Sequence, residues 1–365
     1  YYNKTTMKLK LAVLGSGGIA SQHLESLKKI RNYKIKYICD INLKKANILS
    51  KQIPESKAID NFDFILKDKE IDIVDICLPP YLHFSTALKF LKSGKHVICE
   101  KPLSTSVREA EELIDYSNKN KVNLYPVFQY RYGKNIKTLK YLINENITGI
   151  PIKASSEVHW KRDEKYYNVS WRGTWKGEGG GVILIHAIHS HDILSFILGD
   201  IVSVSANLAT LVNDIETEDS ASIIMSTKNG ALISSSITLG AASNTSRFKF
   251  IFKNITAESG NNPYNPGEGD WAYIARDNSK QNELDKLIKD YQKNIFSDQD
   301  GFTNFFTEIA NHLEGKKSEI VEANEGLKSI ELVAAIYKAA RSEKKVFLPI
   351  NKNSLIYNNW YPNQN

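Results

Sequence analysis

The stretch LAVLGSGGIA at residues 11–20 decides the fold. An apolar run ends at Leu14, a G-x-G-x-x-A loop follows at once, and a helical pattern begins after it. A loop of this kind between a strand and a helix is typical of proteins that bind the pyrophosphate of a dinucleotide. Gly15 permits the tight turn, Gly17 lets the backbone approach the phosphates, and Ala20 keeps the helix close to the sheet. The first N–H groups of the helix then point at the anion.

A carboxylate follows at the spacing that such a site requires. Asp40 ends the second apolar run, 20 residues after Ala20. At this position a carboxylate accepts hydrogen bonds from the ribose hydroxyls of adenosine and repels a 2′-phosphate. Ile41 and Asn42 come next rather than arginine, so the sequence favours NAD over NADP. The alternative is an ordinary glycine-rich turn in a parallel sheet.

Strand and helix patterns alternate outward from this loop. Apolar runs at residues 11–14, 35–39, 73–78, 96–99 and 123–127 alternate with helical patterns at 19–30, 43–52, 83–93 and 107–118. This alternation predicts βαβ units, and uniformly apolar runs are typical of strands buried on both faces. We therefore expect an α/β fold whose N-terminal domain, residues 7–128, is a Rossmann-type, doubly wound parallel sheet.

The pattern changes after about residue 149. Longer, alternating strands are expected at 152–160, 201–211, 221–227, 231–239 and 247–252, with helices at 182–198, 300–314 and 324–342. Asn229-Gly230 predicts a type I′ hairpin between two of these strands. Alternation indicates an antiparallel sheet with one exposed face. We expect a C-terminal α/β domain over residues 129–349, with a large, open, mostly antiparallel sheet, and a tail at 350–365.

Composition excludes several classes of protein. The 365 residues suit two domains, and 42% apolar with 24% charged residues excludes a disordered or disulfide-scaffold chain. A net charge of +7 on scattered lysines argues against nucleic-acid binding. The sequence has no apolar run of membrane-spanning length, and its first ten residues lack a signal-peptide core. Three unpaired cysteines, at 39, 77 and 99, favour a reducing compartment, so we expect a cytoplasmic protein without a membrane partner.

Unusual residues follow the predicted parallel strands, at the carboxyl ends where ligands bind in such sheets. They are Leu78, Pro79 and His83, then Glu100, Lys101 and Pro102, then Gln129. Lys101 is the most informative, because Pro102 restricts its backbone and its ammonium can donate a hydrogen bond to a substrate oxygen. A salt bridge to Glu100 is the alternative. The three cysteines, also at strand ends, are expected to pack as small buried side chains.

The motif GEGGGVILIHAIHSHD at residues 177–192 places three histidines in one predicted helix. At 100° per residue, His186, His189 and Asp192 share a face, whereas His191 points elsewhere. Neither H-E-x-x-H nor a cysteine pair accompanies them, so we expect no metal. A neutral histidine near a cofactor is the usual base for a hydroxyl proton. A hydrogen-bonded histidine without a chemical role is the alternative.

Aromatic residues are concentrated just upstream of this motif. Five of them fall within 16 positions: Trp160, Tyr166, Tyr167, Trp171 and Trp175. Arg162, Asp163, Arg172 and Lys176 lie among them in the sequence. Flat apolar rings beside hydrogen-bonding groups suit a polyhydroxylated ring as ligand. An aromatic cluster that covers the core of the sheet is the alternative.

Taken in order, these motifs resemble the Gfo/Idh/MocA oxidoreductases, named for glucose–fructose oxidoreductase and inositol dehydrogenase. The resemblance runs from about residue 7 to 349. It rests on the glycine loop, the P-x-x-x-H at 79–83, Glu100-Lys101-Pro102, Trp171-Arg172, Gly179-Gly180-Gly181, His189 and Asp192. It implies an NAD(P)-dependent dehydrogenase acting on a secondary hydroxyl of a sugar, sugar derivative or cyclitol. It also implies homodimers or homotetramers formed through the C-terminal sheet.

The resemblance implies roles for individual residues. Lys101 would polarise and orient the reacting hydroxyl, and His189 would act as acid and base. The implied cofactor-binding residues are Gly15, Gly17, Gly18, Ile19, Ala20, Asp40, Leu78, Pro79, His83, Glu100, Lys101, Gln129, Trp171 and Arg172. The implied substrate-binding residues are Lys101, Tyr166, Trp175, Ile185, His186 and His189.

One position departs from the family pattern. Many members carry an aspartate four residues before the catalytic histidine, where this chain has Ile185. An isoleucine cannot ionise or hydrogen-bond, so the proton relay stays open between His186 and a pairing of Lys101 with His189. Three other functions stay open: a cofactor-loaded sugar-binding or regulatory protein without turnover, an NAD-retaining glycosidase, and a metal-dependent hydrolase using His186, His189 and Asp192.

Overall fold

The computed structural model describes residues 8–295 and 300–362, which form two compact units. The first unit contains the chain up to Val127 together with Asp300–Leu327, and the second contains the rest. The division thus lies one residue from the expected boundary at 128. Residues 300–327 depart from the expected domains by joining the first unit. The expected tail contains a short helix, α14 (Leu355–Asn358), and a fully buried Trp360.

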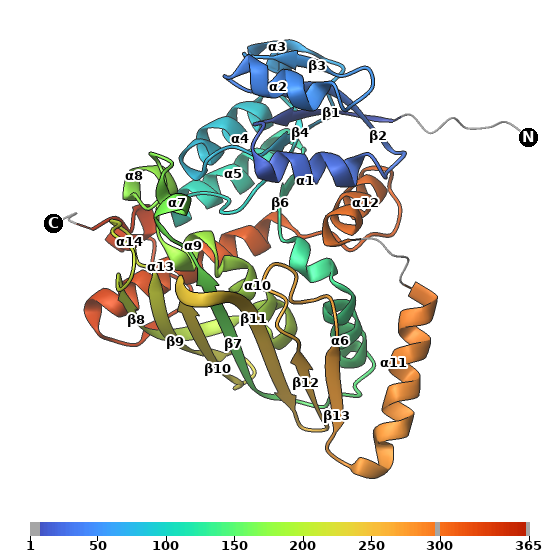
Figure 1. The fold of residues 1–365 in the computed structure, drawn as a ribbon, viewed down its shortest axis with the longest axis vertical. Helices are drawn as coiled ribbons and strands as arrows, with labels where there is room; N and C mark the ends of the chain where they lie inside the picture. Colours follow the sequence, from blue (N-terminus) through green and yellow to red (C-terminus); the bar gives the residue numbers. More distant parts are fainter. Residues whose placement is uncertain (1–7, 296–299, 363–365) are drawn as a thin grey trace, which may run out of the picture. The chain divides into compact units, whose positions relative to one another are not determined.

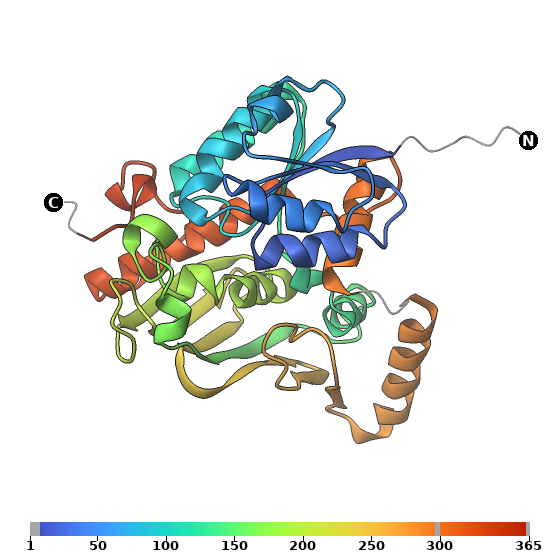
Figure 2. The ribbon, with the colours of Figure 1, turned by 45° about the horizontal axis from the view of Figure 1, so that its top comes forward.

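The first unit is built on a six-stranded parallel sheet with the order β3-β2-β1-β4-β5-β6. Its strands are β1 (Leu9–Leu14), β2 (Tyr33–Cys39), β3 (Lys57–Ile59), β4 (Ile73–Ile76), β5 (His96–Cys99) and β6 (Leu124–Pro126). Helices α1 (Gly18–Leu27) and α2 (Leu43–Ser50) lie on one side, and α4 (His83–Lys92) and α5 (Val107–Asn120) on the other (Figures 1 and 2). This confirms the expected Rossmann-type sheet.

Burial explains why the strands of this sheet are apolar throughout. Leu11, Val13 and Ile76 are at most 1% exposed, because helices cover both faces. Helix α12 (Gly301–Leu313) adds to this core from far along the chain, since Phe305 and Phe306 are fully buried and Phe306 packs against His23 of α1. The apolar face of α12 therefore explains why residues 300–327 belong to the first unit.

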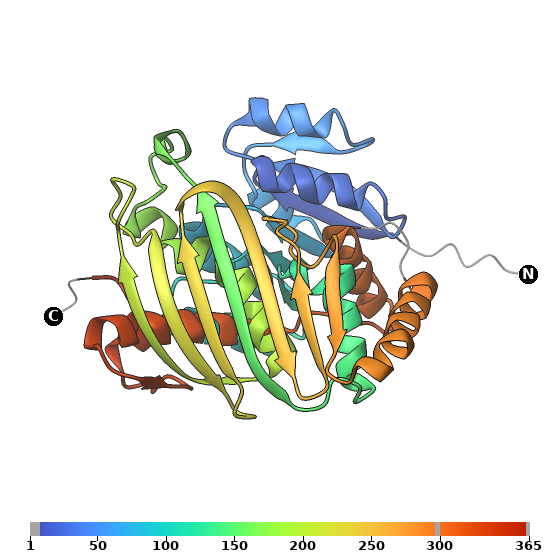
Figure 3. The same ribbon diagram turned by 60° about the horizontal axis from the view of Figure 1, so that its bottom comes forward.

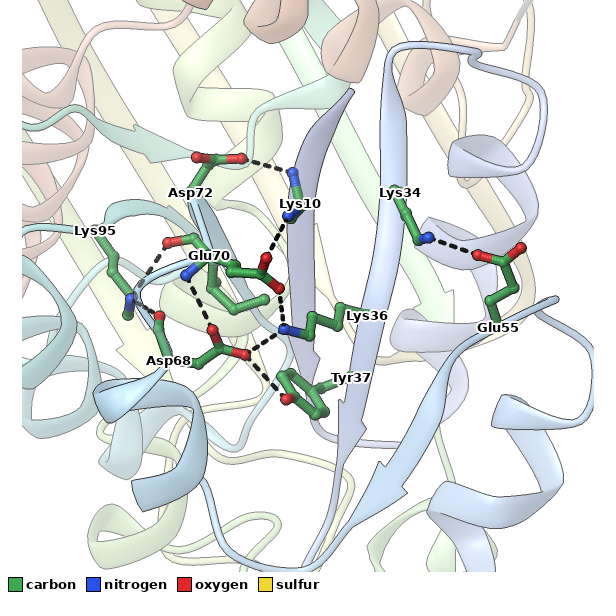
Figure 4. Close-up of polar contacts among 10 residues, drawn as sticks. Lys10, Lys34, Lys36, Tyr37, Glu55, Asp68, Glu70, Asp72 and Lys95 are labelled. Carbon is green, nitrogen blue, oxygen red and sulfur yellow. Dashed lines mark hydrogen bonds and ion pairs between the residues drawn. The ribbon is translucent and has the colours of Figure 1, made fainter. Parts of the chain in front are cut away.

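A network of charged residues lies toward the amino ends of β1 and β4 (Figure 4). The Lys36 ammonium lies 2.6 Å from Asp68 and 2.7 Å from Glu70, and the Lys10 ammonium lies 3.0 Å from Glu70. Although burial raises the pKa of Asp68, the hydrogen bond from Lys36 lowers it to about 2. Ligands bind at the opposite ends of such strands, so this network is no part of the candidate site.

The second unit is built on an eight-stranded sheet with the order β13-β12-β11-β7-β10-β9-β8-β14. Its strands are β7 (Pro151–Lys161), β8 (Ile201–Ala209), β9 (Ser220–Thr227), β10 (Leu232–Thr238), β11 (Gly240–Phe252), β12 (Ile255–Ser259), β13 (Trp271–Ala275) and β14 (Val346–Phe347). Every pair of neighbours is antiparallel except β7 and β10. The expected open, mostly antiparallel sheet is confirmed.

Helices cover one face of this sheet, and Figure 3 views the other face. The helices of the second unit include α6 (Lys134–Asn144), α10 (Ile188–Leu198), α11 (Gln281–Ile295) and most of α13 (Ala323–Ser342). Burial alternates along β9: Ile223 and Met225 are at most 2% exposed, whereas Ile224 is 65% exposed. The sheet therefore has one core face and one exposed face.

Two local expectations were wrong. The helix expected at 182–198 is broken into α9 (Val182–Ile185) and α10, where the Ala187 N–H bonds to the Val182 carbonyl five residues back. The hairpin between β9 and β10 exists, but its turn is not type I′. That turn needs positive φ at both central residues, and of Asn229 and Gly230 only Gly230, at +85°, has it.

A helix that spans a membrane must be both long and apolar. Among the described residues, no single helix meets both requirements, and one bent pair, Trp175–Ile185 with Ile188–Leu198, meets them by length and composition only.

Candidate functional site

The glycine-rich loop leaves β1 at its carboxyl end and enters α1. Gly15 has φ of +98°, and a Cβ there would collide with the carbonyl oxygen of Cys77, so the turn requires glycine. Around Gly17 and Gly18 the space for a Cβ is open to 4 Å. Gly17 precedes α1 without a side-chain cap, so the first N–H groups of the helix are not capped by a side chain. Open space and such N–H groups fit a pyrophosphate.

Asp40 is held beside this loop. One of its carboxylate oxygens accepts the N–H of Ser16 and the other accepts the N–H of Asn42, both at 2.8 Å. Each oxygen keeps a further lone pair with which it can accept a ribose hydroxyl. The loop and Asp40 together therefore fit the adenosine diphosphate half of a dinucleotide.

His83 joins the segments that follow β4 and β5. Its Nδ1 lies 2.6 Å from the carbonyl oxygen of Pro102, and its Nε2 lies 2.7 Å from that of Leu78. Burial lowers the pKa of His83, while the two carbonyl contacts raise it. Because both ring nitrogens contact the backbone, His83 braces the segments that carry Leu78, Pro79 and Lys101.

His23 in α1 is a site residue that the sequence analysis missed. This fully buried ring places Nδ1 2.9 Å from Asp75 and Nε2 3.0 Å from Glu100. The other oxygen of Glu100 accepts the backbone N–H of Lys101 at 3.0 Å. Burial lowers the pKa of His23, but Asp75 and Cys77 raise it well above its usual value. A charged imidazole therefore connects α1 and β4 to the backbone of Lys101. The available signal was a histidine on the buried face of the helix that follows the loop.

The cysteines belong to the packing of this unit. Cys39, Cys77 and Cys99 are free thiols and buried. Within the described residues, His23, Asp75 and Cys77 form the one group of three metal-ligand types whose ligand atoms lie within 4.8 Å of one another. Burial, together with Asp75, raises the pKa of Cys77 to about 12, so the thiol stays protonated. The contacts of His23 with both carboxylates account for the cluster as a hydrogen-bonded network.

His189 lies in α10 of the second unit and is 5% exposed. Its ring stacks on Tyr130 at 4.6 Å and meets Phe128 edge-on at 5.8 Å. Gln129 is also buried, and its amide oxygen has no hydrogen-bond partner in the part of the chain that the structure describes. A buried polar atom of this kind suits contact with a polar ligand group.

The structure brings several of the expected substrate residues together. The Tyr166 hydroxyl lies 3.2 Å from His186 Nε2, and His186 meets Trp160 edge-on at 5.4 Å. The Arg172 guanidinium lies 3.9 Å from the centre of the Tyr166 ring. Trp175 lies elsewhere in the unit, where its ring packs against Tyr337 at 5.5 Å and Tyr361 at 6.0 Å.

Of His186, His189 and Asp192, expected to share one helical face, only the last two lie in the same helix, α10. The helix breaks after Ile185, so His186 does not follow the helical period of the other two. The Asp192 carboxylate accepts two hydrogen bonds from Arg131, at 2.6 and 2.8 Å, and both residues are buried. Asp192 thus neutralises a buried guanidinium, which weakens the case for a metal-dependent hydrolase.

Glu218 is a second residue that the sequence analysis missed. Its carboxylate accepts the N–H groups of Gly181 and Ile183 at 3.2 Å and the hydroxyl of Tyr337 at 2.9 Å. Burial raises its pKa to about 7. A Cβ on Gly181 would collide with Glu218. This carboxylate therefore fixes the glycine-rich turn that leads into α9. Nothing in the local pattern around residue 218 marks it, because its partners lie far away in the sequence.

Family models match both halves of the chain. Residues 9–128 match the model described as an oxidoreductase family with an NAD-binding Rossmann fold, and residues 136–258 match the GFO/IDH/MocA C-terminal domain. The myo-inositol 2-dehydrogenase of Thermotoga maritima is 27% identical over 231 residues, 61% of this chain and 66% of that protein. The glucose-6-phosphate 3-dehydrogenase of Bacillus subtilis is 33% identical over 165 residues, 45% of this chain and 46% of that protein. The chain thus spans less than two thirds of these relatives.

Solved structures resemble the chain over nearly its whole length. The WlbA dehydrogenase of Chromobacterium violaceum, in complex with NADH and UDP-GlcNAcA, has a TM-score of 0.83 and 25% identity. The match covers 95% of this chain and 98% of that one. A levoglucosan dehydrogenase in complex with NADH has a TM-score of 0.75 at 20% identity, covering 94% of this chain and 100% of that one. At that identity the likeness shows the fold alone.

Proposed function

Because the chain belongs to the GFO/IDH/MocA family of oxidoreductases, we propose that it is an NAD-dependent dehydrogenase. Its substrate is a sugar, sugar derivative or cyclitol, in which it oxidises a secondary hydroxyl or reduces the corresponding ketone. One observation carries this proposal: the glycine loop after β1 and Lys101 after β5 lie at the same, carboxyl edge of one parallel sheet. Ligands bind at that edge in open α/β sheets.

The chain's own residues position the reacting hydroxyl and manage its proton. When bound, NAD supplies the hydride acceptor. Lys101 donates a hydrogen bond to the reacting oxygen and stabilises the negative charge that develops there. His189 takes the hydroxyl proton, and its stacking on Tyr130 limits rotation of the ring. Because Ile185 cannot bind a proton, His186, which contacts the Tyr166 hydroxyl, takes over the relay in this proposal.

We expect the protein to form NADH from NAD+ with at least one member of a panel of sugars and cyclitols. Turnover with NADP+ is expected to be at least about tenfold slower, because Asp40 repels a 2′-phosphate. NADH absorbance measures both rates. Sugar and NADH binding without turnover would support the regulatory alternative, and product formation without net NADH would support the glycosidase. Hydrolysis of a substrate without NADH formation, abolished by a chelator, would support the hydrolase.

We also propose that copies of the chain associate through the exposed face of the second unit's sheet. This face carries Ile224, Leu232 and Ile274, each more than half exposed, beside an ion network in which Arg247 contacts Glu258 at 3.2 Å. Exposed apolar side chains beside charged ones on one face are typical of protein interfaces. Analytical ultracentrifugation is expected to show a dimer or tetramer. Ile224→Asp should dissociate it, whereas Ile48→Asp, at a similarly exposed position on α2, should not. A wild-type monomer would contradict this.

A further inference from the structure

Two arginine side chains of the second unit lie over one tyrosine ring. The guanidinium carbon of Arg172 is 3.9 Å from the centre of the Tyr166 ring, and that of Arg162 is 4.9 Å from the same centre. Arg162 also lies 5.0 Å from the ring of Trp160 and 6.0 Å from that of Tyr264. Aromatic faces attract a guanidinium and hold it in place, so both cations are positioned before any ligand arrives.

Three donor atoms of these two cations have no hydrogen-bond partner among the described residues, although Arg162 also forms a side-chain hydrogen bond with Tyr166. Arg162 donates from Nη1 to the carbonyl of Lys161 at 2.7 Å, while its Nε is buried without a hydrogen-bond partner. Nε and Nη1 of Arg172 are buried without partners as well. No carboxylate of the described residues forms a salt bridge with either arginine. Buried N–H groups of a cation are costly when unsatisfied, so an acceptor bound here stabilises the arrangement.

Two other ionisable groups contact or act on the same tyrosine. Tyr166 contacts His186 Nε2, a neutral or positive group. The Glu178 carboxylate, which accepts the backbone N–H of Gly173 at 2.6 Å, also acts on Tyr166. The side chains of Arg162, Arg172 and Glu178 together carry a net positive charge. The free donors of the two arginines therefore favour an anionic acceptor over a neutral hydroxyl.

We propose that Arg162 and Arg172 bind an acidic group of the substrate, so that the substrate class is a sugar carrying a carboxylate or phosphate. This rests on the proposed function and narrows it, because a neutral sugar or cyclitol has no group to neutralise the pair. The planar fork of arginine matches both anions through two parallel hydrogen bonds. The rings of Trp160 and Tyr166 lie beside the cations, where a sugar can stack its C–H face. A phosphate of the dinucleotide is the other source of the same chemistry.

Calorimetry on the NADH-loaded protein tests this with glucose, glucuronate and glucose 6-phosphate as probes. At least one acidic sugar is expected to bind about 10–100-fold more tightly than glucose, the range for charge-assisted hydrogen bonds, and added salt should reduce the advantage. Arg162→Gln is expected to abolish the preference, and Arg162→Lys to keep only part of it. Lys161→Gln removes the same charge from an exposed neighbour and should leave the preference intact.

Two results would overturn the proposal. One is equal affinity for glucose and both acids. The other is a loss of NADH affinity in Arg162→Gln and Arg172→Gln, measured by tryptophan fluorescence, while the preference for acidic sugars stays intact. That result would assign the two arginines to the phosphates of the cofactor. If Arg162→Gln fails to fold, Arg162→Lys decides the outcome. These experiments measure binding and do not require turnover. If the protein has no dehydrogenase activity, the proposed function fails, but the preference for acidic sugars can still be measured.

Discussion

Replacing Lys101 by alanine is expected to lower kcat by roughly 10³-fold while NADH binding is retained. The ammonium is proposed to stabilise the oxygen that loses its proton, an interaction that strengthens in the transition state. The backbone of Lys101 is held by Glu100, and Glu100 by His23, through hydrogen bonds of 3.0 Å. The alanine variant keeps these backbone contacts. The loss should therefore appear in the chemical step and not in cofactor affinity.

NADH formation gives kcat, and tryptophan fluorescence during an NADH titration gives the dissociation constant. Lys119→Ala, which removes an exposed lysine of α5 in the same unit, serves as the control and should leave both unchanged. Unchanged turnover in Lys101→Ala would exclude the proposed role. An equal loss of NADH affinity would make Lys101 a cofactor-binding residue instead.

Replacing His23 by leucine is expected to lower the free energy of unfolding by about 3–5 kcal/mol, the usual effect of removing one partner from a buried ionic contact. Asp75 and Glu100, 0% and 5% exposed, would then be buried without their counter-charge. Urea unfolding measures the change. Glu25→Ala breaks the exposed pair with Lys28 on the same helix and should cost less than about 1 kcal/mol.

The stabilisation from His23 depends on pH in a defined direction. Asp75 and Cys77 raise the folded-state pKa of His23 above its unfolded value, so the folded state holds the proton more tightly. The contribution is complete below about pH 6.5 and is lost as the pH rises through the folded-state pKa. Wild-type stability should show this decline and His23→Leu should lack it. Parallel pH profiles for the two proteins would mean that His23 is not charged in the folded state.

The sequence by itself determined the parallel sheet of the first unit and its glycine-rich loop. Both follow from signals between near neighbours: apolar runs of strand length, helical periods between them, and a turn at Gly15 that requires positive φ. The alternation along β9 likewise predicted a sheet with one exposed face. Gly230 predicted the hairpin, but the type of turn depends on the backbone angles of Asn229, which composition does not fix.

Only the tertiary structure decided how the site residues are held. His23 meets Asp75 and Glu100 across 52 and 77 positions, and Glu218 meets the turn at Gly181 across 37. Such contacts produce no periodic pattern in the sequence, because they depend on how separate helices and strands pack together. Asp192 is a further example. The sequence placed it among candidate metal ligands, whereas in the structure its carboxylate pairs with Arg131. Burial raises the pKa of Glu100, whereas His23 and then the charge of Lys101 lower it, so the alternative of a Glu100–Lys101 salt bridge stays open.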